Sequence, residues 1–406
     1  MRVLITVSAW ATHWSALVPL GWALQAAGHE VRVLCPQSQV GAVAGTGMIP
    51  VPVLDGLDDS TRLRLQYYEE AVAGIWPYPW LPLHPITGAE LSSLDEFDLA
   101  HYREHAEPVF AARRASSFDA AVAFARSWRP HLALHDPASL EGLLAARVTD
   151  VPAVLCLWGP VGTHEPEHMR IVPTDHSGSF PRYGLGEFST DMVEYVIDPC
   201  PPSLAPPTRA HRLPVRYVPY NGCEPVPSWL LEPPRGRRVC VAWSTALSSM
   251  SGPKSYLLPE LAAALGDSPY EVVVTATSGD VAGIGEVPAS VRVVERLPLR
   301  LVLPTCDAVV HHGGSGSTLT SLWAGLPQFL PTFASEQTAT ARRVAGTGAA
   351  VHVLGHLADR TTVRAAVDRL MADDSYRTAG RGLREEILGR PTPAEVVPRL
   401  ERLALS

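Results

Sequence analysis

The stretch AVVHHGGSGSTLTSLWAGLPQFLP, Ala308–Pro331, decides the fold, because it joins a buried strand, a glycine-rich turn, a helix start and a second strand. Its first residues are apolar and favour a strand, and the glycines that follow let the backbone turn tightly and approach a ligand. Ser317, Thr318 and Thr320 then open a helix, whose free N–H groups and positive dipole end attract a phosphate or diphosphate. The order of strand, turn and helix therefore predicts an anion site.

Two histidines, His311 and His312, stand at the C-terminal end of this strand, which is where ligands bind in open α/β sheets. We expect either imidazole to donate a hydrogen bond to a phosphate oxygen. A glycine-rich turn alone is weak support for a ligand site, because such turns also serve as tight corners. The pattern of strands around it is more informative.

Strand-like and helix-like segments alternate along both halves of the 406-residue chain. The first half opens with a βαβ unit, in which the strand Arg2–Val7 leads to the helix Trp14–Ala27 and the strand Glu30–Cys35. A polar and aromatic insertion follows over 54–102, and then a long helix over 106–128. This length and alternation predict two α/β domains, each with a parallel sheet wound by helices. Further strands are expected at 131–135, 153–157, 238–243, 271–275, 291–295, 308–311, 328–331 and 350–354.

A dense series of prolines runs from Pro199 to Pro234 and breaks both helix and strand. We interpret this region as the connection between the domains, and we assign its start to the last helix of the N-terminal domain.

Composition excludes several classes of protein. The 33 basic and 41 acidic residues give a net charge of −8, which argues against a nucleic-acid partner. No apolar run approaches the roughly 20 residues of a membrane span, and MRVLITVSAW is typical of a first strand rather than a signal peptide. We therefore expect a cytoplasmic protein with reduced cysteines and no metal cluster. The six cysteines are scattered without a CxxC pair, at Cys35, Cys156, Cys200, Cys223, Cys240 and Cys306.

The glycine-rich stretch and the segment from His13 to Val31 resemble the GT-B glycosyltransferases, specifically the bacterial branch that decorates polyketides and other natural products. The second segment resembles the family pattern HxxPxxPLAxALxxxGHEV, and the resemblance covers nearly the whole chain. It implies two Rossmann-like domains that face each other across a cleft. The implied boundaries are an acceptor-binding domain at 1–215, a linker at 216–236, a nucleotide-sugar domain at 237–375, and helices at 376–406 that return to the first domain.

The resemblance makes His13 the general base. Histidine suits this task, since its pKa near 6.5 lets it remove a proton from an acceptor hydroxyl at neutral pH. Asp136 matches the partner carboxylate of the family, although an Asp before Pro137 also suits the cap of the next helix. His135 is an alternative partner or acceptor contact, or the inward end of its strand.

On the donor side, His312 matches the family histidine that contacts the diphosphate. Thr320 replaces a glutamate that binds the ribose diol in many relatives, which favours thymidine diphosphate (dTDP) sugars over uridine diphosphate sugars; a threonine facing only the helix surface is the alternative. Arg296 stands where an aromatic residue often stacks on the base, and its plane can also stack. The remaining donor-site candidates are Thr245, Leu297, Gly314, Ser315, Gly316, Ser317, Glu336 and Gln337.

Aromatic residues are the candidates for the acceptor-binding site. Trp10 lies in the loop before His13, and Trp158 begins a loop that we expect to line the cleft together with the insertion. Trp76, Tyr78 and Trp80 of the insertion are expected to form walls for a large aglycone, or else to cover the core or a dimer face.

The implied reaction is an inverting, metal-independent transfer of a sugar, expected to be a deoxysugar, from a nucleoside diphosphate to a hydroxyl of a polyketide or macrolide. No cofactor is expected besides the sugar nucleotide. An epimerase of sugar nucleotides and a non-catalytic nucleotide-binding helper are the alternatives, and a homodimer or an auxiliary activator protein stays open. The hypothesis requires that both imidazoles face one cleft that admits a nucleoside.

Overall fold

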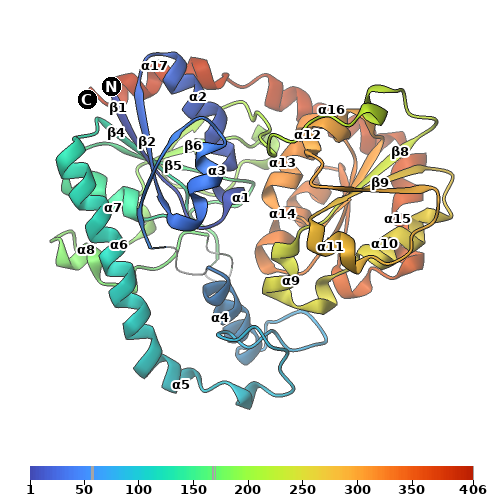
Figure 1. Cartoon of the computed structure of the whole chain (residues 1–406), viewed down its shortest axis with the longest axis horizontal. Coiled ribbons are helices and arrows are strands. Elements are labelled where there is room, and N and C mark those ends of the chain that lie inside the picture. The colour runs from blue at the N-terminus through green and yellow to red at the C-terminus, as the bar shows by residue number, and fades with distance from the viewer. Residues whose placement is uncertain (56–58, 167–168, 170, 406) are drawn as a thin grey trace.

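A computed structural model describes residues 1–55, 59–166, 169 and 171–405, with the backbone alone at positions 59, 245 and 246. The chain forms two α/β lobes side by side, and the N- and C-termini lie close together on the first lobe (Figure 1). No described helix combines the length and the apolar character that a membrane span needs.

The N-terminal domain contains a seven-stranded parallel sheet in the order β3-β2-β1-β4-β5-β6-β7. Its strands are β1 Arg2–Thr6, β2 Glu30–Pro36, β3 Ile49–Leu54, β4 Leu132–His135, β5 Ala153–Cys156, β6 Tyr195–Asp198 and β7 His211–Pro214. Its helices are α1 Ala11–Trp14, α2 Val18–Ala26, α3 Val40–Ala44, α4 Asp59–Val72, α5 Leu99–His101, α6 Glu107–Trp128, α7 Glu141–Val148 and α8 Ser179–Arg182.

The C-terminal domain contains a six-stranded parallel sheet in the order β10-β9-β8-β11-β12-β13. Its strands are β8 Arg238–Ala242, β9 Glu271–Ala276, β10 Val291–Glu295, β11 Ala308–His311, β12 Gln328–Thr332 and β13 Ala350–Leu354. The helices are α9 Thr245–Ser251, α10 Leu258–Gly266, α11 Ser278–Gly283, α12 Leu299–Val302, α13 Ser315–Ala324, α14 Ser335–Gly346, α15 Arg360–Ala372, α16 Asp374–Leu388 and α17 Pro393–Leu403.

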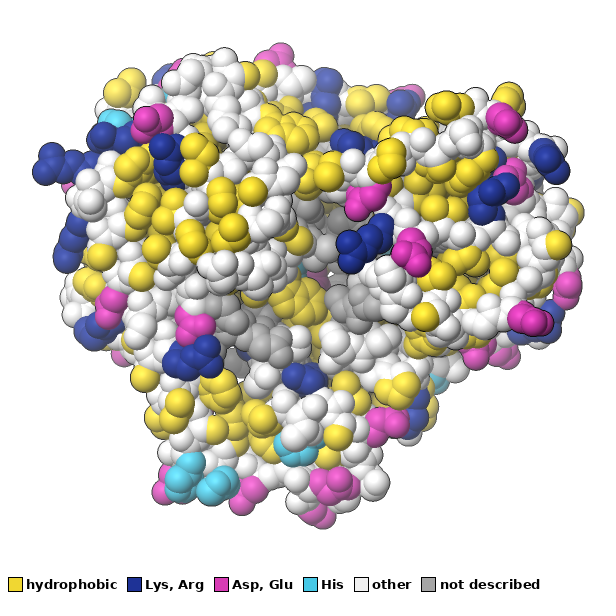
Figure 2. Space-filling view, in the orientation of Figure 1, with side chains coloured by type: hydrophobic (Ala, Val, Ile, Leu, Met, Phe, Trp, Pro, Cys, Tyr) yellow, Lys and Arg dark blue, Asp and Glu magenta, His cyan; other side chains and the backbone are white. Residues whose placement is uncertain are grey.

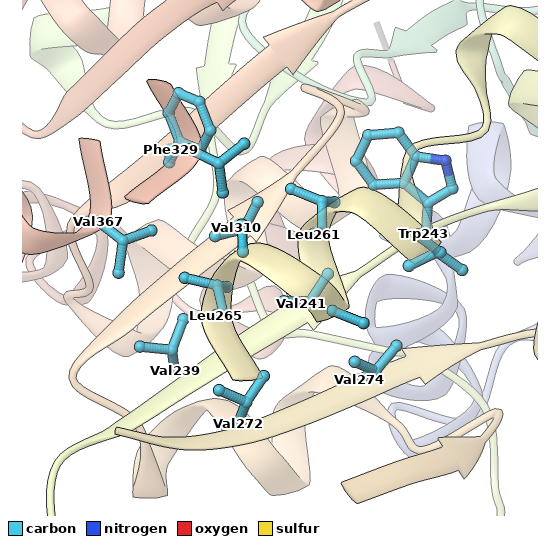
Figure 3. Packing of buried hydrophobic residues seen from close by; sticks show 14 of the residues in the cluster. Val239, Val241, Trp243, Leu261, Leu265, Val272, Val274, Val310, Phe329 and Val367 are labelled. Carbon is cyan, nitrogen blue, oxygen red and sulfur yellow. The ribbon is translucent and has the colours of Figure 1, made fainter. Parts of the chain in front are cut away.

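The core of the second domain fills the space between its sheet and the helices on one face. Valines of β8, β9 and β11 contact Leu261 and Leu265 of α10, and Val367 of α15 closes the layer (Figure 3). These strands are buried on both faces, so they read in the sequence as short continuous apolar runs. This rigid layer holds the turn between β11 and α13 in place.

The expectation that the proline-rich region starts in a helix is wrong. β6 ends at Asp198, and the chain then forms the edge strand β7, which pairs with β6 and ends at Pro214. An edge strand tolerates proline, because the missing N–H is not needed for pairing on its outer side. The other edge strand, β3, likewise contains Pro50 and Pro52.

The two C-terminal helices pack on different domains. α16 lies against α13 in the second domain, whereas α17 runs back and packs on α2 of the first (Figure 1). Val396, Val397 and Leu400 of α17 are buried in the core that contains β1 and β2. The C-terminal helix α17 thus belongs to the hydrophobic core of the N-terminal domain.

Candidate active site

The turn between β11 and α13 has the backbone geometry of an anion cradle. Gly313 has φ +88°, which favours glycine, and a Cβ there would lie 3.1 Å from the Gln337 carbonyl oxygen. Gly314 then caps α13 from extended backbone, and nothing lies within 4 Å of the position of a Cβ on Gly316. The N-terminal amides of a ten-residue helix can therefore be approached over Gly316.

His312 and His311 differ in their surroundings. His311 is fully buried; its Nδ1 accepts from the Gly313 N–H at 3.1 Å, and its Nε2 lies 2.8 Å from Gln328 Oε1. Both of its nitrogens are thus engaged inside the domain, so the expectation that His311 contacts a phosphate is wrong. His312 is held by a hydrogen bond with Gln337, and burial lowers its pKa to about 4, which leaves a neutral imidazole at pH 7.

Ser315 connects this cradle to Glu336. The Ser315 hydroxyl donates to Glu336 Oε1 at 3.2 Å, and the same oxygen accepts from Trp158 Nε1 of the other domain at 3.1 Å. Burial raises the pKa of the Glu336 carboxyl above its ordinary value. Ser317 lies in the first turn of α13, and its carbonyl accepts from the Ser321 hydroxyl at 2.7 Å.

Thr320 does not face a ribose site in this conformation. It is fully buried, and its hydroxyl lies 3.0 Å from the Tyr217 hydroxyl and 3.2 Å from Asn221 Nδ2, both in the segment that joins the domains. The hydroxyl also donates to the Gly316 carbonyl at 2.7 Å, one helical turn back. The linker therefore covers this face of α13, and the argument for a deoxyribose from Thr320 loses its basis.

Arg296 and Leu297, which were expected to contact the nucleobase, follow the end of β10 and lie next to the end of β9. Arg296 is exposed, has φ +49°, and donates its N–H to the Ala276 carbonyl at 2.9 Å. Leu297 is buried, and its carbonyl already accepts from the Thr275 hydroxyl at 3.1 Å. Thr245 begins α9, and its side chain lies outside the described part of the structure.

His13 stands in α1, directly after β1. Its ring stacks on Trp158 with centroids 4.0 Å apart and lies 5.5 Å from Trp10. Burial, followed by the positive charge of Arg62, lowers the pKa of His13 to about 3, so the imidazole is neutral at pH 7. A neutral imidazole is the form that can accept a proton.

Asp136 organises the turn that carries His13. Its carboxylate accepts from the N–H groups of Ala138 at 2.8 Å and Ser139 at 3.0 Å, in a turn that precedes α7 and its N-cap Leu140, and from the Ser8 N–H at 2.6 Å, so the expected cap of the next helix is not what Asp136 provides. The Ser8 hydroxyl in turn lies 3.4 Å from His13 Nδ1. Asp136 is therefore joined to the base loop through Ser8. His135 is fully buried in β4, with Nδ1 3.1 Å from the Asp136 carbonyl.

A cavity of about 60 Å³ lies where the two domains meet, and the face drawn in Figure 2 is hollowed between the two lobes. Of the predicted residues it brings together His13, Trp10, Trp158, Glu336 and Gln337. Its remaining described lining residues, which the sequence analysis missed, are Arg62, Leu63, Gln66 and Tyr67 of α4, with Met169, Ile171, Met250 and Ala334. Arg62, Gln66 and Tyr67 recur at helical spacing, and this periodicity could have revealed α4 within the insertion.

Of the two imidazoles that were expected to face one crevice, His13 is among the described residues that line this cavity and His312 is not. His312 hydrogen-bonds Gln337, which lines the same cavity. The crevice is nearly shut, however: a Cβ on Gly159 would lie 2.5 Å from Ser315 Cβ across it. In this conformation the crevice is therefore too narrow to admit a nucleoside. The domains must separate, since ligand pockets usually have volumes of about 300 Å³ or more.

The insertion aromatics tie α4 to the second domain instead of lining this cavity. The Trp76 ring lies 5.4 Å from Tyr67, and its Nε1 donates to the Trp80 carbonyl at 2.7 Å. The Tyr78 hydroxyl donates to the Thr332 carbonyl at 3.1 Å, while both Tyr78 and Trp80 stack near Phe333. These three residues cover the core, which was the alternative interpretation.

Comparison with known proteins identifies the family to which the chain belongs. The chain matches the erythromycin biosynthesis protein CIII-like family over both its N-terminal domain, at residues 22–244, and its C-terminal domain, at residues 259–403. It is 35% identical to tylactone mycaminosyltransferase of Streptomyces fradiae, over 99% of this chain and 92% of that protein. It is 36% identical to 10-deoxymethynolide desosaminyltransferase of Streptomyces venezuelae, over 100% and 97%.

Among solved structures, spinosyn rhamnosyltransferase SpnG complexed with thymidine diphosphate superposes with a TM-score of 0.77 at 27% identity, covering 99% of this chain and 100% of that one. Glycosyltransferase VinC in complex with dTDP gives 0.76 at 26% identity, with full coverage of both chains. The family match over both domains and the full-length identity to the mycaminosyl- and desosaminyltransferases show that the chain belongs to the erythromycin biosynthesis protein CIII-like family, and it is a glycosyltransferase of GT-B fold.

Proposed function

We propose that the protein transfers a sugar from a dTDP-sugar to a hydroxyl group of a polyketide or macrolide aglycone, with inversion at the anomeric carbon. The observation that carries this proposal is the placement of His13 across one cavity from Glu336 and Gln337, beside the N-terminus of α13. The choice of dTDP is supported by the structural neighbours named with that nucleotide, since Thr320 no longer argues for it. The aglycone class is supported by relatives that act on tylactone and 10-deoxymethynolide.

In this mechanism His13 Nε2 or Nδ1 takes the proton of the acceptor hydroxyl. The hydroxyl oxygen forms a bond to the anomeric carbon, while the bond from that carbon to the diphosphate oxygen breaks and its electron pair leaves on the diphosphate. The α13 amides and the His312 imidazole stabilise the developing charge. Glu336 and Gln337, at the start of α14, are placed to orient the sugar hydroxyls.

The test combines binding with turnover. Wild-type protein should bind dTDP more tightly than uridine diphosphate in calorimetry. The substitution His13→Ala should lower turnover by about 10²–10⁴-fold, the usual contribution of a general base, and leave dTDP affinity unchanged. The exposed His105→Ala serves as the control. Equal turnover in His13→Ala would remove the base assignment.

Product analysis separates the alternatives. Transfer requires an aglycone, and the anomeric coupling constant of the product reports inversion. An epimerase would change the donor sugar without an acceptor, and a helper protein would bind nucleotide without turnover.

A further inference from the structure

Helix α4 presents one polar and aromatic face to the cleft. Arg62, Leu63, Gln66 and Tyr67 line the cavity, and their spacing puts them on one side of the helix. α4 comes from the insertion in the N-terminal domain, yet it lies below the cleft beside α9 of the second domain (Figure 1). It is therefore placed to add side chains to the donor half of the site.

The position of α4 on the second domain is fixed by packing and by hydrogen bonds. Tyr67 is buried in a cluster with Met250 and Ala334. One carboxylate oxygen of Glu70 accepts from the Ser335 hydroxyl at 2.8 Å, at the first turn of α14, and the other accepts from Gln66 Nε2 at 3.1 Å. The helix that carries Arg62 is thus docked on the domain that holds the anion cradle.

The charges in the cavity are few. Among its described lining residues, Arg62 is the only permanent cation and Glu336 the only carboxylate. Glu336 contacts Ser315 at the start of α13, and the charge of Arg62 acts on both Glu336 and His13. The guanidinium therefore lies within electrostatic reach of the cradle and of the base at once.

The cradle itself supplies only neutral donors, namely backbone amides, hydroxyls and the neutral His312 imidazole. A nucleoside diphosphate that leaves carries more negative charge than these groups balance. An arginine presents paired N–H groups that match phosphate oxygens, and it keeps its charge at every working pH.

We propose that Arg62 is a further donor-binding and catalytic residue, a cation that α4 adds to the cleft to bind the diphosphate and neutralise the charge on it as the sugar departs. The proposal rests on the proposed function, because it takes a nucleoside diphosphate sugar as the donor.

Arg62 also affects the pKa of His13, the proposed general base. Burial and Arg62 together hold the pKa of His13 low in the free protein. Among the described residues, the other charged or titratable groups around His13 are Tyr67 of α4, Glu336 of α14, and Asp136, which accepts from Ser8 of the same loop. A diphosphate that pairs with Arg62 removes part of the repulsion on the imidazolium, so donor binding raises the pKa of His13 and strengthens the base.

The experiment compares dTDP with thymidine, which lacks the charged groups, in titration calorimetry. Arg62→Gln should weaken dTDP binding by about 10- to 100-fold, the range for hydrogen bonds to charged groups, and leave thymidine binding unchanged. Arg103→Gln is the matched control. It removes one exposed arginine, which pairs with Glu69 of α4, and it should change the affinity for neither dTDP nor thymidine. Arg62→Lys, which keeps the charge, should recover most of the affinity.

A second readout is the imidazole titration of His13 by NMR. Addition of dTDP should raise the pKa of His13 in the wild type, and the rise should be smaller in Arg62→Gln. Unchanged dTDP affinity in Arg62→Gln, with a raised KM for the aglycone alone, would overturn the proposal and assign Arg62 to the acceptor. Absence of dTDP binding by the wild type would instead refute the proposed function. If Arg62→Gln does not fold, Arg62→Lys and the salt dependence of dTDP binding decide the matter, and salt-independent binding counts against the proposal.

Discussion

Three buried histidines make the folded protein sensitive to mild acid. His135 and His311 are fully buried and His312 is 8% exposed, and burial lowers their pKa values from 6.5 to about 4, 3 and 4 respectively. At pH 5 the folded state keeps these imidazoles neutral, whereas the unfolded state protonates them. Because the unfolded state binds more protons, the free energy of unfolding falls as the pH drops from about 6.5 towards 4.

The size of this effect follows from the shifts. Between pH 7 and pH 5 each imidazole stabilises the unfolded state by about 2 kcal/mol, since each pKa unit corresponds to 1.36 kcal/mol. The three together give about 6 kcal/mol, which is comparable with the whole stability of many domains, about 5–15 kcal/mol. His13 and His352, whose pKa values burial lowers to about 3 and 4, act in the same direction. Glu336 opposes this trend, because its raised pKa lets the folded state take up a proton.

The assay is urea unfolding at pH 7, 6 and 5, followed by tryptophan fluorescence and circular dichroism. His311→Gln should reduce the difference in unfolding free energy between pH 7 and pH 5 by about 2 kcal/mol, whatever it costs at pH 7. His101→Gln, which changes an exposed histidine, should keep the full difference. Equal stability of the wild type at pH 5 and pH 7 would refute the reasoning, and so would an unchanged pH dependence in His311→Gln.

Four further results are expected. Gly314→Ala places a Cβ 2.7 Å from the His312 ring, so the ring must move, and dTDP affinity by calorimetry should fall by about tenfold, or 1.4 kcal/mol. Gly159→Ala puts a Cβ 2.5 Å from Ser315 Cβ, so closure is blocked; kcat should fall more than dTDP affinity, and Ser315→Gly in the same chain should restore part of it. Arg343→Met leaves the buried Glu165 carboxylate without its guanidinium partner, which should lower the unfolding free energy by about 3 kcal/mol; adding Glu165→Gln should recover part, and an additive loss would contradict a direct pair. Chelator should leave turnover unchanged, because in the proposed reaction the amides, the His312 imidazole and Arg62 stabilise the leaving diphosphate; loss that Mg²⁺ restores would contradict this.

The fold could be predicted well where the signal is local. All six strands of the second sheet were expected close to their observed bounds, because buried parallel strands are short apolar runs between turns. Three strands of the first sheet, β3, β6 and β7, were missed. In the edge strands β3 and β7 the prolines argue against a strand, and only pairing along one side makes them acceptable, whereas β6 is only four residues long and the residues that follow it were assigned to a helix. A pattern of residues does not say whether a strand lies at an edge.

The site could be predicted where a motif fixes the backbone, and not where distant segments meet. The cradle after β11 and His13 after β1 follow from their own turns. The burial of Thr320 depends on Tyr217 and Asn221, about 100 residues earlier, which occupy its hydroxyl. Arg62 was not predicted as a site residue for the same reason, because only tertiary packing brings α4 to the cleft.

The closed cleft and the position of α4 together determine how the site must open. Glu165 pairs with Arg343 and Trp158 bonds Glu336 across the cleft, so both contacts must break before a sugar nucleotide enters. α4 packs on the second domain through Tyr67 and on the first domain through Tyr68, which is buried with Phe97 and Tyr102, whereas His13 stands after β1 in the first domain. In the proposed reaction, opening would therefore separate His13 from the cradle, and closure over the donor would bring His13 beside the diphosphate and remove water from it. Chemistry is then confined to the closed state, which protects the donor from hydrolysis while the aglycone is absent.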